Sequence, residues 1–510
     1  MPKISLLTLS RFLWALVLVT LPVTSFRYLP FMGAGTTVRP LALYPLALLL
    51  PVLLVRVKRC EIQRPWPGAL TVLLAFLLAA LAATAFGATL APVELRGVDF
   101  FDRALRAGIT LVIGLMFFVA AVWMNESEQD VKFSVKWLLV GLVAHLVWGA
   151  IQFVGLNTGH RQQLLKIQQL FSVRGLVKNK RISGFAYEPS WLAGQIATLY
   201  LPWLVAGLMM KYRVLQADDK PQTIDHERQT IVHRLSTVVR WIEPLLLLAA
   251  LAALLMTYSR SGLVVAVLAG LATFALAGGE TVKAFWGWVL AGFDRQHWTN
   301  KMAALQAAGS RILLAILAVA VFVAAGLFLA DKGYIATFFK SDKSDLFSYA
   351  VDVYLGPRLA YATAAMTSFQ EYPLTGVGLG ASGFWIYQNM PDWVLSGVPE
   401  ISEQLSPLSS LYPNAKNLYV RLLTETGLAG FVVFLAFYLA VLADALGLLR
   451  SPGAARWLGA AGIFALAAVM LQGVSQDSFA MPEMWLNLGI LVGAAGALQM
   501  QITKRKMELQ

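Results

Sequence analysis

One short segment of the chain carries far more positive than negative charge. Residues 156–189 contain a single acid, Glu188, and the basic residues Arg161, Lys166, Arg174, Lys178, Lys180 and Arg181. Arginine presents a planar fork of N–H donors that matches phosphate oxygens. The segment is therefore either a solvated or headgroup-contacting loop or an anion site, for which phosphate or pyrophosphate is the obvious candidate.

The end of this segment holds a compact group of candidate functional residues. Pro189 suits the first turn of a helix, and Glu188 just before it complements the positive end of the helix dipole. The same carboxylate is also a candidate for catalysis or acceptor binding. Tyr187 and Trp191 are candidate sugar-binding residues, because aromatic faces with polar edges suit the C–H patches and hydroxyls of a sugar.

Another arginine, Arg260, interrupts an apolar stretch that runs from residue 244 to 279. It lies in Thr257-Tyr-Ser-Arg-Ser-Gly262, which we expect to be a tight turn between two membrane spans. An arginine is costly there unless its side chain reaches the interface or pairs with an anion. Arg260 is therefore a candidate anion ligand.

Arg358 is a further candidate anion ligand, and a glycine-rich turn follows it in the sequence. Gly378, Gly380 and Gly383 formally satisfy the G-x-G-x-x-G spacing of dinucleotide sites, but no strand–helix unit surrounds them. The glycines instead indicate a tight turn or a close approach of the backbone to a ligand. No zinc-ligand spacing, phosphate-binding loop or nucleophile elbow occurs in the sequence, so we expect neither a metal nor a cofactor.

Four polar residues recur at short intervals farther along the chain: Lys416, Asn417, Arg421 and Glu425. This spacing predicts one face of a helix that points at the outer interface. Arg421 and Glu425 would form an i,i+4 ion pair on that face.

Aromatic residues are dense in the interval before this motif. Residues 331–416 hold seven of the fifteen tyrosines, Tyr412 among them. Such a density suits sugar binding, although aromatic side chains also anchor proteins at membrane interfaces.

Membrane helices must position all of these residues. Of the 510 residues 58% are hydrophobic and 14% charged, whereas a soluble protein carries about 25% charged residues. Apolar runs of about twenty residues can cross a bilayer. They predict spans at 12–25, 41–57, 69–91, 104–124, 135–155, 190–210, 243–258, 261–279, 311–330, 427–446, 457–475 and 484–500. The expected fold class is an all-α polytopic membrane protein with about twelve transmembrane helices.

The distribution of charge orients these spans. The net charge is +13, and placing both termini in the cytoplasm puts most Lys and Arg inside, as the positive-inside rule requires. The loops 156–189 and 331–416, the latter between spans nine and ten, then lie outside. The single cysteine, Cys60, excludes an intramolecular disulfide and any multi-cysteine metal or redox site.

The chain divides into three parts on this interpretation. We expect residues 1–134 to form N-terminal transmembrane helices and residues 501–510 to form a basic cytoplasmic tail. Residues 135–500, with both outside loops, would form the functional membrane domain.

Four motifs in this order resemble the bacterial O-antigen ligase and O-antigen polymerase superfamily. They are residues 181–191, 258–262, 373–380 and 416–430, and the resemblance covers roughly residues 135–500. Asn417, Gly427 and Gly430 match the spacing of the family's ligase motif. In that motif a His precedes the Asn, whereas Lys416 stands at this position here.

The resemblance implies a GT-C-like membrane enzyme of the bacterial inner membrane. Such enzymes use sugars linked to undecaprenyl pyrophosphate on the periplasmic face, without nucleotide hydrolysis. An acceptor hydroxyl attacks the anomeric carbon, and lipid pyrophosphate leaves. The base that accepts the hydroxyl proton is a His in the ligases, which puts ligase chemistry in doubt for a chain with Lys416.

The same resemblance distributes roles among the candidate residues. It implies that the leaving pyrophosphate is held by the cations Lys180, Arg181, Arg260 and Arg358. The acceptor proton would pass to one of three groups: Glu188, Lys416 or Glu425. Acceptor and sugar binding would fall to Tyr187, Trp191, Tyr412 and Asn417.

We therefore predict a polymerase of lipid-linked repeat units for O-antigen, capsule or exopolysaccharide. The nearest alternative is the ligase that transfers finished glycan to lipid A core. A flippase or transporter of lipid-linked sugar is a third possibility, although transporters typically show internal repeats and ionisable residues deep in the bilayer. Expected partners are the lipid-linked glycan, membrane lipid and a chain-length regulator or flippase, with no nucleic acid.

Overall fold

The computed structural model describes most of the membrane part of the chain. It covers residues 5–28, 37–90, 94–173, 180–210, 242–279, 355–392, 394, 398–406, 409, 412–451 and 455–508, with the isolated positions 283, 309 and 327. All regular structure among these residues is helical, which confirms the predicted class.

The described helices follow one another along the chain in this order. The first half contains α1 (Leu6–Thr20), α2 (Leu43–Lys58), α3 (Gly68–Gly87), α4 (Phe100–Met124), α5 (Glu128–Asn157), α6 (Arg161–Phe171), α7 (Pro189–Gln195), the π-helical turn η1 (Ile196–Tyr200) and α8 (Leu201–Met209). The second half contains α10 (Arg260–Ala277), α15 (Gly356–Glu371), α16 (Ser382–Gln388), α18 (Pro399–Leu405), α19 (Leu418–Arg450), α20 (Ala455–Gly473), η3 (Pro482–Met484) and α21 (Leu486–Glu508). A further apolar helix spans Ile242–Met256.

Seven helices in the described part of the chain are long and apolar enough to cross a membrane. They are Gly68–Gly87, Phe100–Met124, Glu128–Asn157, Pro189–Met209, Arg260–Ala277, Leu418–Arg450 and Ala455–Gly473. The expected number of about twelve is therefore not confirmed. The predicted span 311–330 lies outside the described residues except for position 327, and every other predicted span overlaps a helix.

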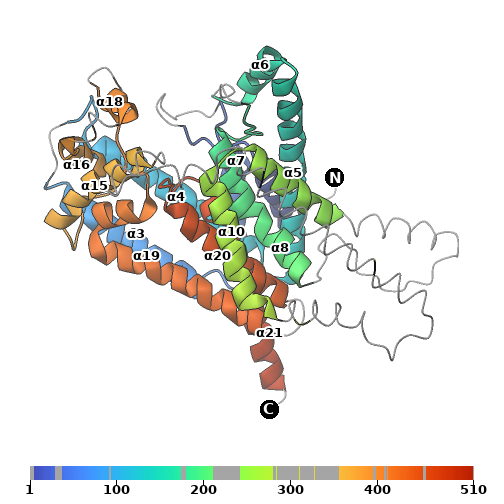
Figure 1. Ribbon diagram of the computed structural model, residues 1–510. Coiled ribbons are helices and arrows are strands. Elements are labelled where there is room, and N and C mark those ends of the chain that lie inside the picture. The colour runs from blue at the N-terminus through green and yellow to red at the C-terminus, as the bar shows by residue number, and fades with distance from the viewer. Residues whose placement is uncertain are drawn as a thin grey trace.

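The long helices pack into one bundle, and short helices gather at one end of it (Figure 1). α19 packs against α3 and α20, α4 packs against α21, and α10 packs against α20. The short helices α6, α15, α16 and α18 lie at the end opposite the C terminus, at the top of Figure 1, which we call the loop end. The two predicted outside loops thus contain helices: α6 in 156–189, and α15, α16 and α18 in 331–416.

A π-helical turn ties the span that begins at Pro189 to the last helix. The turn η1 leaves backbone carbonyls without their α-helical partners. The buried Asn487 amide of α21 donates to two of them, Thr198 O at 2.6 Å and Leu199 O at 3.1 Å. Trp203 in turn donates to Asn487 Oδ1 at 3.0 Å. These hydrogen bonds fix how far the helix Pro189–Met209 is shifted along its axis relative to α21. The position of α7, the first part of that helix, follows from this.

The backbone of α19 is interrupted at Gly427, which has φ +63°. The carbonyls of Thr424 and Glu425 accept hydrogen bonds from Val377 N and Gly378 N, both at 2.9 Å, instead of from their own helix. Leu428 N donates across the same gap to Pro373 O at 2.8 Å. The turn at 373–378 therefore fills the break in α19 and holds the loop-end helices on the bundle.

Glycine is required where these two segments meet. A Cβ on Gly427 would lie 2.2 Å from Leu374 O, and one on Gly376 would lie 2.5 Å from Gly427 N. Gly376, Gly378 and Gly380 all have positive φ. Of the two sequence-based alternatives, the tight turn is confirmed; the close backbone approach seen here is to the α19 backbone and not to a ligand.

We expect Gly427→Ala to destabilise the fold, because it places a side chain on a left-handed residue and against a carbonyl. The free energy of unfolding should fall by about 1–3 kcal/mol. Gly447→Ala in the regular part of α19 is the matched control, since a Cβ there meets nothing within 4 Å. The measurement is the thermal midpoint of both variants in detergent, and equal midpoints would contradict the assigned role of the break.

Candidate functional site

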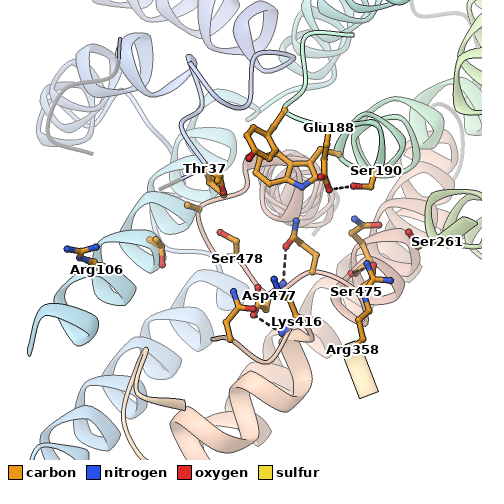
Figure 2. A pocket seen from close by; sticks show the side chains of 18 of the residues that line it. Thr37, Arg106, Glu188, Ser190, Ser261, Arg358, Lys416, Ser475, Asp477 and Ser478 are labelled. Atoms are coloured by element: carbon orange, nitrogen blue, oxygen red, sulfur yellow. Dashed lines mark hydrogen bonds between the residues drawn. The ribbon is translucent and has the colours of Figure 1, made fainter. Parts of the chain in front are cut away.

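A polar cavity opens at the loop end of the bundle. Its volume is about 810 Å³. Its lining comes from α4, α7, α10, α15, the end of α20, the segment before α2, the turn before α19 and the connection between α20 and α21. The charged residues in the lining are Arg106, Glu188, Arg358, Lys416 and Asp477 (Figure 2). Segments far apart in the sequence thus bring two carboxylates and three cations to one cavity.

Buried polar groups of α5 hold the segment that leads to Glu188. Gln152 Oε1 accepts from Ser183 N at 3.0 Å and Gly184 N at 2.8 Å, and its amide donates to Gly184 O at 3.1 Å. His145 packs directly under Gly184, whose φ is +55°. His145 is buried, and its Nε2 lies 3.4 Å from Ser183 O.

Glu188 is the residue before the first turn of α7, and Pro189 is its first residue, as predicted. The Glu188 side chain caps no backbone N–H; instead its Oε1 accepts the hydroxyl hydrogen of Ser190. The carboxylate points into the cavity (Figure 2). Tyr187 and Trp191 flank it with ring centroids 5.1 Å apart, so an aromatic pair borders the carboxylate.

Lys416 reaches the cavity from a strained turn rather than from a helix. Its φ is +54°, and its N–H donates to Asp477 Oδ2 at 3.1 Å. Its Nζ lies 5.8 Å from the centroid of the Tyr361 ring. Left-handed backbone at a residue other than glycine persists only where its surroundings hold it. Asp477, only 7% exposed, supplies that hold.

Two arginines line the cavity from different helices. Arg358 lies in the first turn of α15, and Arg106 lies in the second turn of α4. Both side chains are exposed, and neither makes a hydrogen bond or ion pair with another residue that the structure describes. Arg358, a predicted anion ligand, thus lines the cavity. Arg106 also lines it but was not among the predicted anion ligands.

The other predicted cations lie beside the cavity rather than in its lining. Arg181 Nε donates to Thr257 O at 2.7 Å, which joins the 181–191 motif to the turn before α10. Arg260 is the first residue of α10, and Tyr258 in the same turn has φ +50°. Ser261, the next residue, does line the cavity. Lys180 is exposed.

The prediction that Lys416, Asn417, Arg421 and Glu425 share one helix face is wrong for the first two. α19 begins at Leu418, and Asn417 is its N-cap. Asn417 Oδ1 accepts from Tyr419 N at 2.9 Å and from Val420 N at 3.1 Å. The Asn417 side chain therefore caps the N terminus of α19, so the turn that carries Lys416 ends at Asn417.

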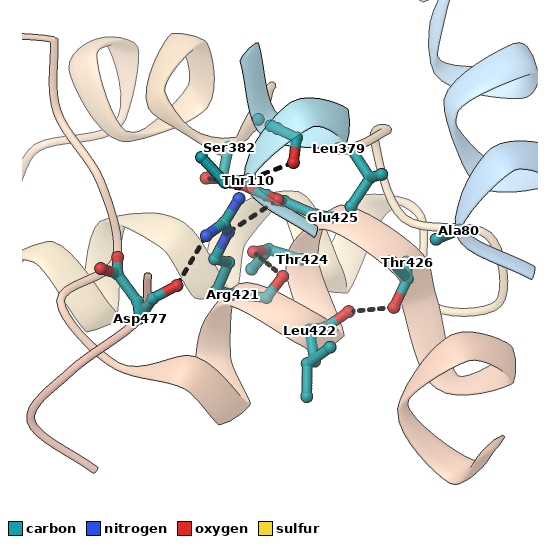
Figure 3. Close-up of polar contacts among 12 residues, drawn as sticks. Ala80, Thr110, Leu379, Ser382, Arg421, Leu422, Thr424, Glu425, Thr426 and Asp477 are labelled. Carbon is teal, nitrogen blue, oxygen red and sulfur yellow. Dashed lines mark hydrogen bonds and ion pairs between the residues drawn. The ribbon is translucent and has the colours of Figure 1, made fainter. Parts of the chain in front are cut away.

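Arg421 and Glu425 form the predicted ion pair, but they do so inside the protein (Figure 3). Glu425 is 3% exposed and both its oxygens are occupied: Oε2 by Arg421 Nε at 2.9 Å and Oε1 by Ser382 Oγ at 2.8 Å. Arg421 Nη1 also donates to Asp477 O at 2.6 Å. The pair therefore joins α19 to α16 and to the α20–α21 connection.

Tyr412 lies behind the cavity in a packed cluster. The guanidinium carbon of Arg103 sits 3.7 Å from the centroid of its ring, and the ring packs edge-on against Phe384. Its hydroxyl donates to Gly380 O at 3.3 Å. Burial raises the pKa of Tyr412 above its ordinary value. These contacts hold the chain just before Asn414 and Lys416.

Sequence reasoning missed the polar connection between α20 and α21. Ser475, Gln476, Asp477 and Ser478 of this connection line the cavity, and so does Gln472 near the end of α20. The available signal was the run of polar residues 475–478 at the end of the predicted span 457–475. Arg106, a charge inside a predicted span, was a second overlooked signal. Within the described ranges, no group of three or more His, Cys, Asp or Glu is placed to hold a metal ion.

The fold and the site define a multi-pass helical membrane protein with a charged cavity at one end of its bundle. Residues 245–435 match the protein-family model described as O-antigen ligase. This range contains α10, α15, α16, α18 and the first half of α19. The resemblance predicted from the motifs is thereby confirmed for this part of the chain. No curated protein matches the sequence.

We expect Glu425→Ala to act through stability, because it leaves the buried Arg421 guanidinium without its carboxylate. Breaking a buried ion pair by removing one partner costs about 3–5 kcal/mol. Glu371→Ala is the control, since Glu371 is exposed at the end of α15. Thermal unfolding in detergent should show a large loss for Glu425→Ala and almost none for the control. An unchanged midpoint for Glu425→Ala would show that this ion pair contributes nothing to the fold.

Proposed function

We propose that the protein is a membrane glycosyltransferase that polymerises undecaprenyl-pyrophosphate-linked repeat units at the periplasmic face of the bacterial inner membrane. The observation that carries the proposal is the shared cavity, where the Glu188 carboxylate faces cations from α4, α15 and the Lys416 turn. The match of residues 245–435 to the O-antigen ligase model supports the same substrate class. Both termini would then be cytoplasmic, and the loop end would face the periplasm.

The reaction is a substitution at the anomeric carbon of the donor sugar. The acceptor hydroxyl oxygen forms the new bond to this carbon, and the bond from the carbon to the pyrophosphate oxygen breaks. The electron pair of the broken bond goes to the leaving pyrophosphate, and the hydroxyl proton goes to a base. The site must therefore supply a proton acceptor and positive charge at two separate places.

Glu188 is the proposed base. It lines the cavity beside the aromatic pair Tyr187 and Trp191, which would hold the sugar ring next to the carboxylate. Ser190 donates to Oε1 of this carboxylate and so helps to orient it in the cavity. Glu425, whose oxygens are both occupied, is assigned a positioning role instead.

Arg358 and Lys416 are the proposed ligands of the leaving pyrophosphate. Both line the cavity, and Asp477 fixes the backbone from which the Lys416 side chain extends. Donors placed in advance around developing negative charge stabilise a transition state without reorganisation. Arg181 supports them indirectly, because its hydrogen bond to Thr257 O holds the turn before α10, the helix that supplies Ser261 to the lining. Arg260 lies between this turn and Ser261, as the first residue of α10.

The first test of this function uses purified protein in nanodiscs with an undecaprenyl-pyrophosphate-linked oligosaccharide and no nucleotide. We expect a ladder of longer lipid-linked glycans on a gel. Transfer that appears only after lipid A core is added would replace the polymerase with the ligase. No transfer in either case, with movement of the lipid-linked sugar across the bilayer of reconstituted liposomes, would replace both with a transporter.

Substitution of the base gives a second prediction. Glu188→Gln removes the proton acceptor but keeps the shape of the side chain, so turnover should fall by about 10²–10⁴-fold. Glu371→Gln, at an exposed carboxylate away from the cavity, should retain wild-type turnover. Ladder formation is measured per folded protein at saturating substrate. Wild-type turnover of Glu188→Gln would remove Glu188 from the role of base.

A further inference from the structure

A second, smaller cavity lies at the end of the bundle opposite the loop end. Its volume is about 520 Å³, and it opens between the last turns of α10 and α19 and the first turn of α20. The ends of α10 and α19 come together near the C terminus in Figure 1. We call this cavity the basal groove. Its lining residues are Leu276, Leu446, Leu449, Arg450, Ser451 and Arg456.

The basal groove lies about one bilayer thickness away from the polar cavity. α10 supplies Ser261 to that cavity from its first turn and Leu276 to the groove from its last turn. Its 18 residues extend about 27 Å, close to the thickness of a hydrocarbon core. α20 likewise reaches from Arg456 in the groove to Gln472 in the cavity. The groove is therefore at the level of the lipid headgroups of the other membrane face.

Two arginines give the groove a positive charge that its lining does not offset. Arg450 lies in the last turn of α19, and Arg456 lies in the first turn of α20. Neither makes a hydrogen bond or ion pair with another residue that the structure describes. None of the described residues that line the groove is acidic. The groove thus offers two sets of guanidinium donors to an anion from outside the chain.

The position of Arg456 also favours an anion beside it. The first turn of a helix has unpaired N–H groups and the positive end of the helix dipole, which stabilise anions and not cations. Arg450 complements the negative end of α19, whereas Arg456 adds a positive charge to the positive end of α20. An anion bound between the two arginines offsets both the cation and the helix end.

Apolar side chains form the rest of the groove and continue from it along α10. Leu276 is 57% exposed, and Leu271, five residues before it, is 59% exposed. A ligand that fits is therefore anionic at the arginines and hydrocarbon along the helix, as a phospholipid is. A net negative headgroup fits better than a zwitterionic one, because the described lining has no carboxylate to pair with an ammonium group.

We propose that the basal groove binds an anionic phospholipid such as phosphatidylglycerol. Its phosphate binds Arg450 and Arg456, and an acyl chain lies along α10. With the topology proposed above, this lipid belongs to the cytoplasmic leaflet. It bridges α10, α19 and α20 at their ends remote from the polar cavity and stabilises their packing there. Lipid binding uses none of the residues assigned to glycan transfer, so this site does not depend on the proposed function.

The test is lipid binding to purified, delipidated protein in detergent. The probes are phosphatidylglycerol, phosphatidylcholine with the same acyl chains, and glycerol phosphate, which carries the anion without the chains. Affinities are measured by native mass spectrometry, and the thermal midpoint is measured with and without each probe. The test variant is Arg450→Ala/Arg456→Ala. Arg456→Gln alone replaces it if the double variant does not fold.

The matched control is Lys58→Ala/Arg59→Ala, which removes the same charge from two exposed residues at the end of α2. α2 ends at the same end of the bundle as the groove. Pro65 O, in the connection that follows, accepts from Trp123 Nε1 in the last turn of α4, whose second turn lines the polar cavity.

We expect the wild type to bind phosphatidylglycerol more tightly than phosphatidylcholine and to gain thermal stability from it. Arg450→Ala/Arg456→Ala should weaken phosphatidylglycerol binding about tenfold or more, as the loss of hydrogen bonds to a charged group predicts. It should also lose the rise in thermal midpoint. Lys58→Ala/Arg59→Ala should match the wild type in both measurements.

Three results would overturn the lipid site. Equal affinity for the two lipids would show that the groove does not select an anion. An equal loss of affinity in both double variants would show only general attraction to positive charge. A rise in midpoint with glycerol phosphate as large as that with phosphatidylglycerol would assign the arginines to a soluble anion. Each result is obtained without glycan and so leaves the proposed transferase function untouched.

Discussion

The packing of the loop end onto the membrane bundle depends on one break in backbone hydrogen bonding. At Gly427 the carbonyls of α19 turn from their own helix to the N–H groups of Val377 and Gly378. Buried backbone groups must be paired, so the turn at 373–378 can occupy no other register without leaving these carbonyls unsatisfied. The helices α15 and α16 flank this turn, and their positions follow from it.

A buried guanidinium extends this constraint to the cavity. Arg421 lies one turn into α19, where it binds Glu425 and the carbonyl of Asp477. The side chain of Asp477 in turn accepts the N–H of Lys416. A chain of contacts therefore runs from Glu425, near the break in α19, through Arg421 and Asp477 to Lys416 in the cavity. A buried ion pair contributes little net stability but fixes geometry, and here it fixes the α20–α21 connection.

Backbone strain also occurs in two of the motifs that surround the cavity. Among the described residues other than glycine, Tyr258 and Lys416 are two of the four with positive φ. One precedes Arg260, and the other enters the cavity itself. Such conformations cost about 1–3 kcal/mol each and persist where the surrounding structure holds them. The contacts of Arg181 with Thr257 and of Asp477 with Lys416 provide that support.

The amino-acid sequence by itself determined the local features of this protein. The length of the apolar runs determined a helical membrane protein, Pro189 determined where α7 begins, and a spacing of four residues paired Arg421 with Glu425. Only the tertiary structure decided that Glu188, Arg358 and Lys416 face one cavity with Asp477, and that Arg181 and Glu425 are engaged elsewhere. The physical reason is that these contacts join segments separated by dozens to hundreds of residues, whose mutual positions depend on helix packing and backbone pairing rather than on any periodicity within one segment.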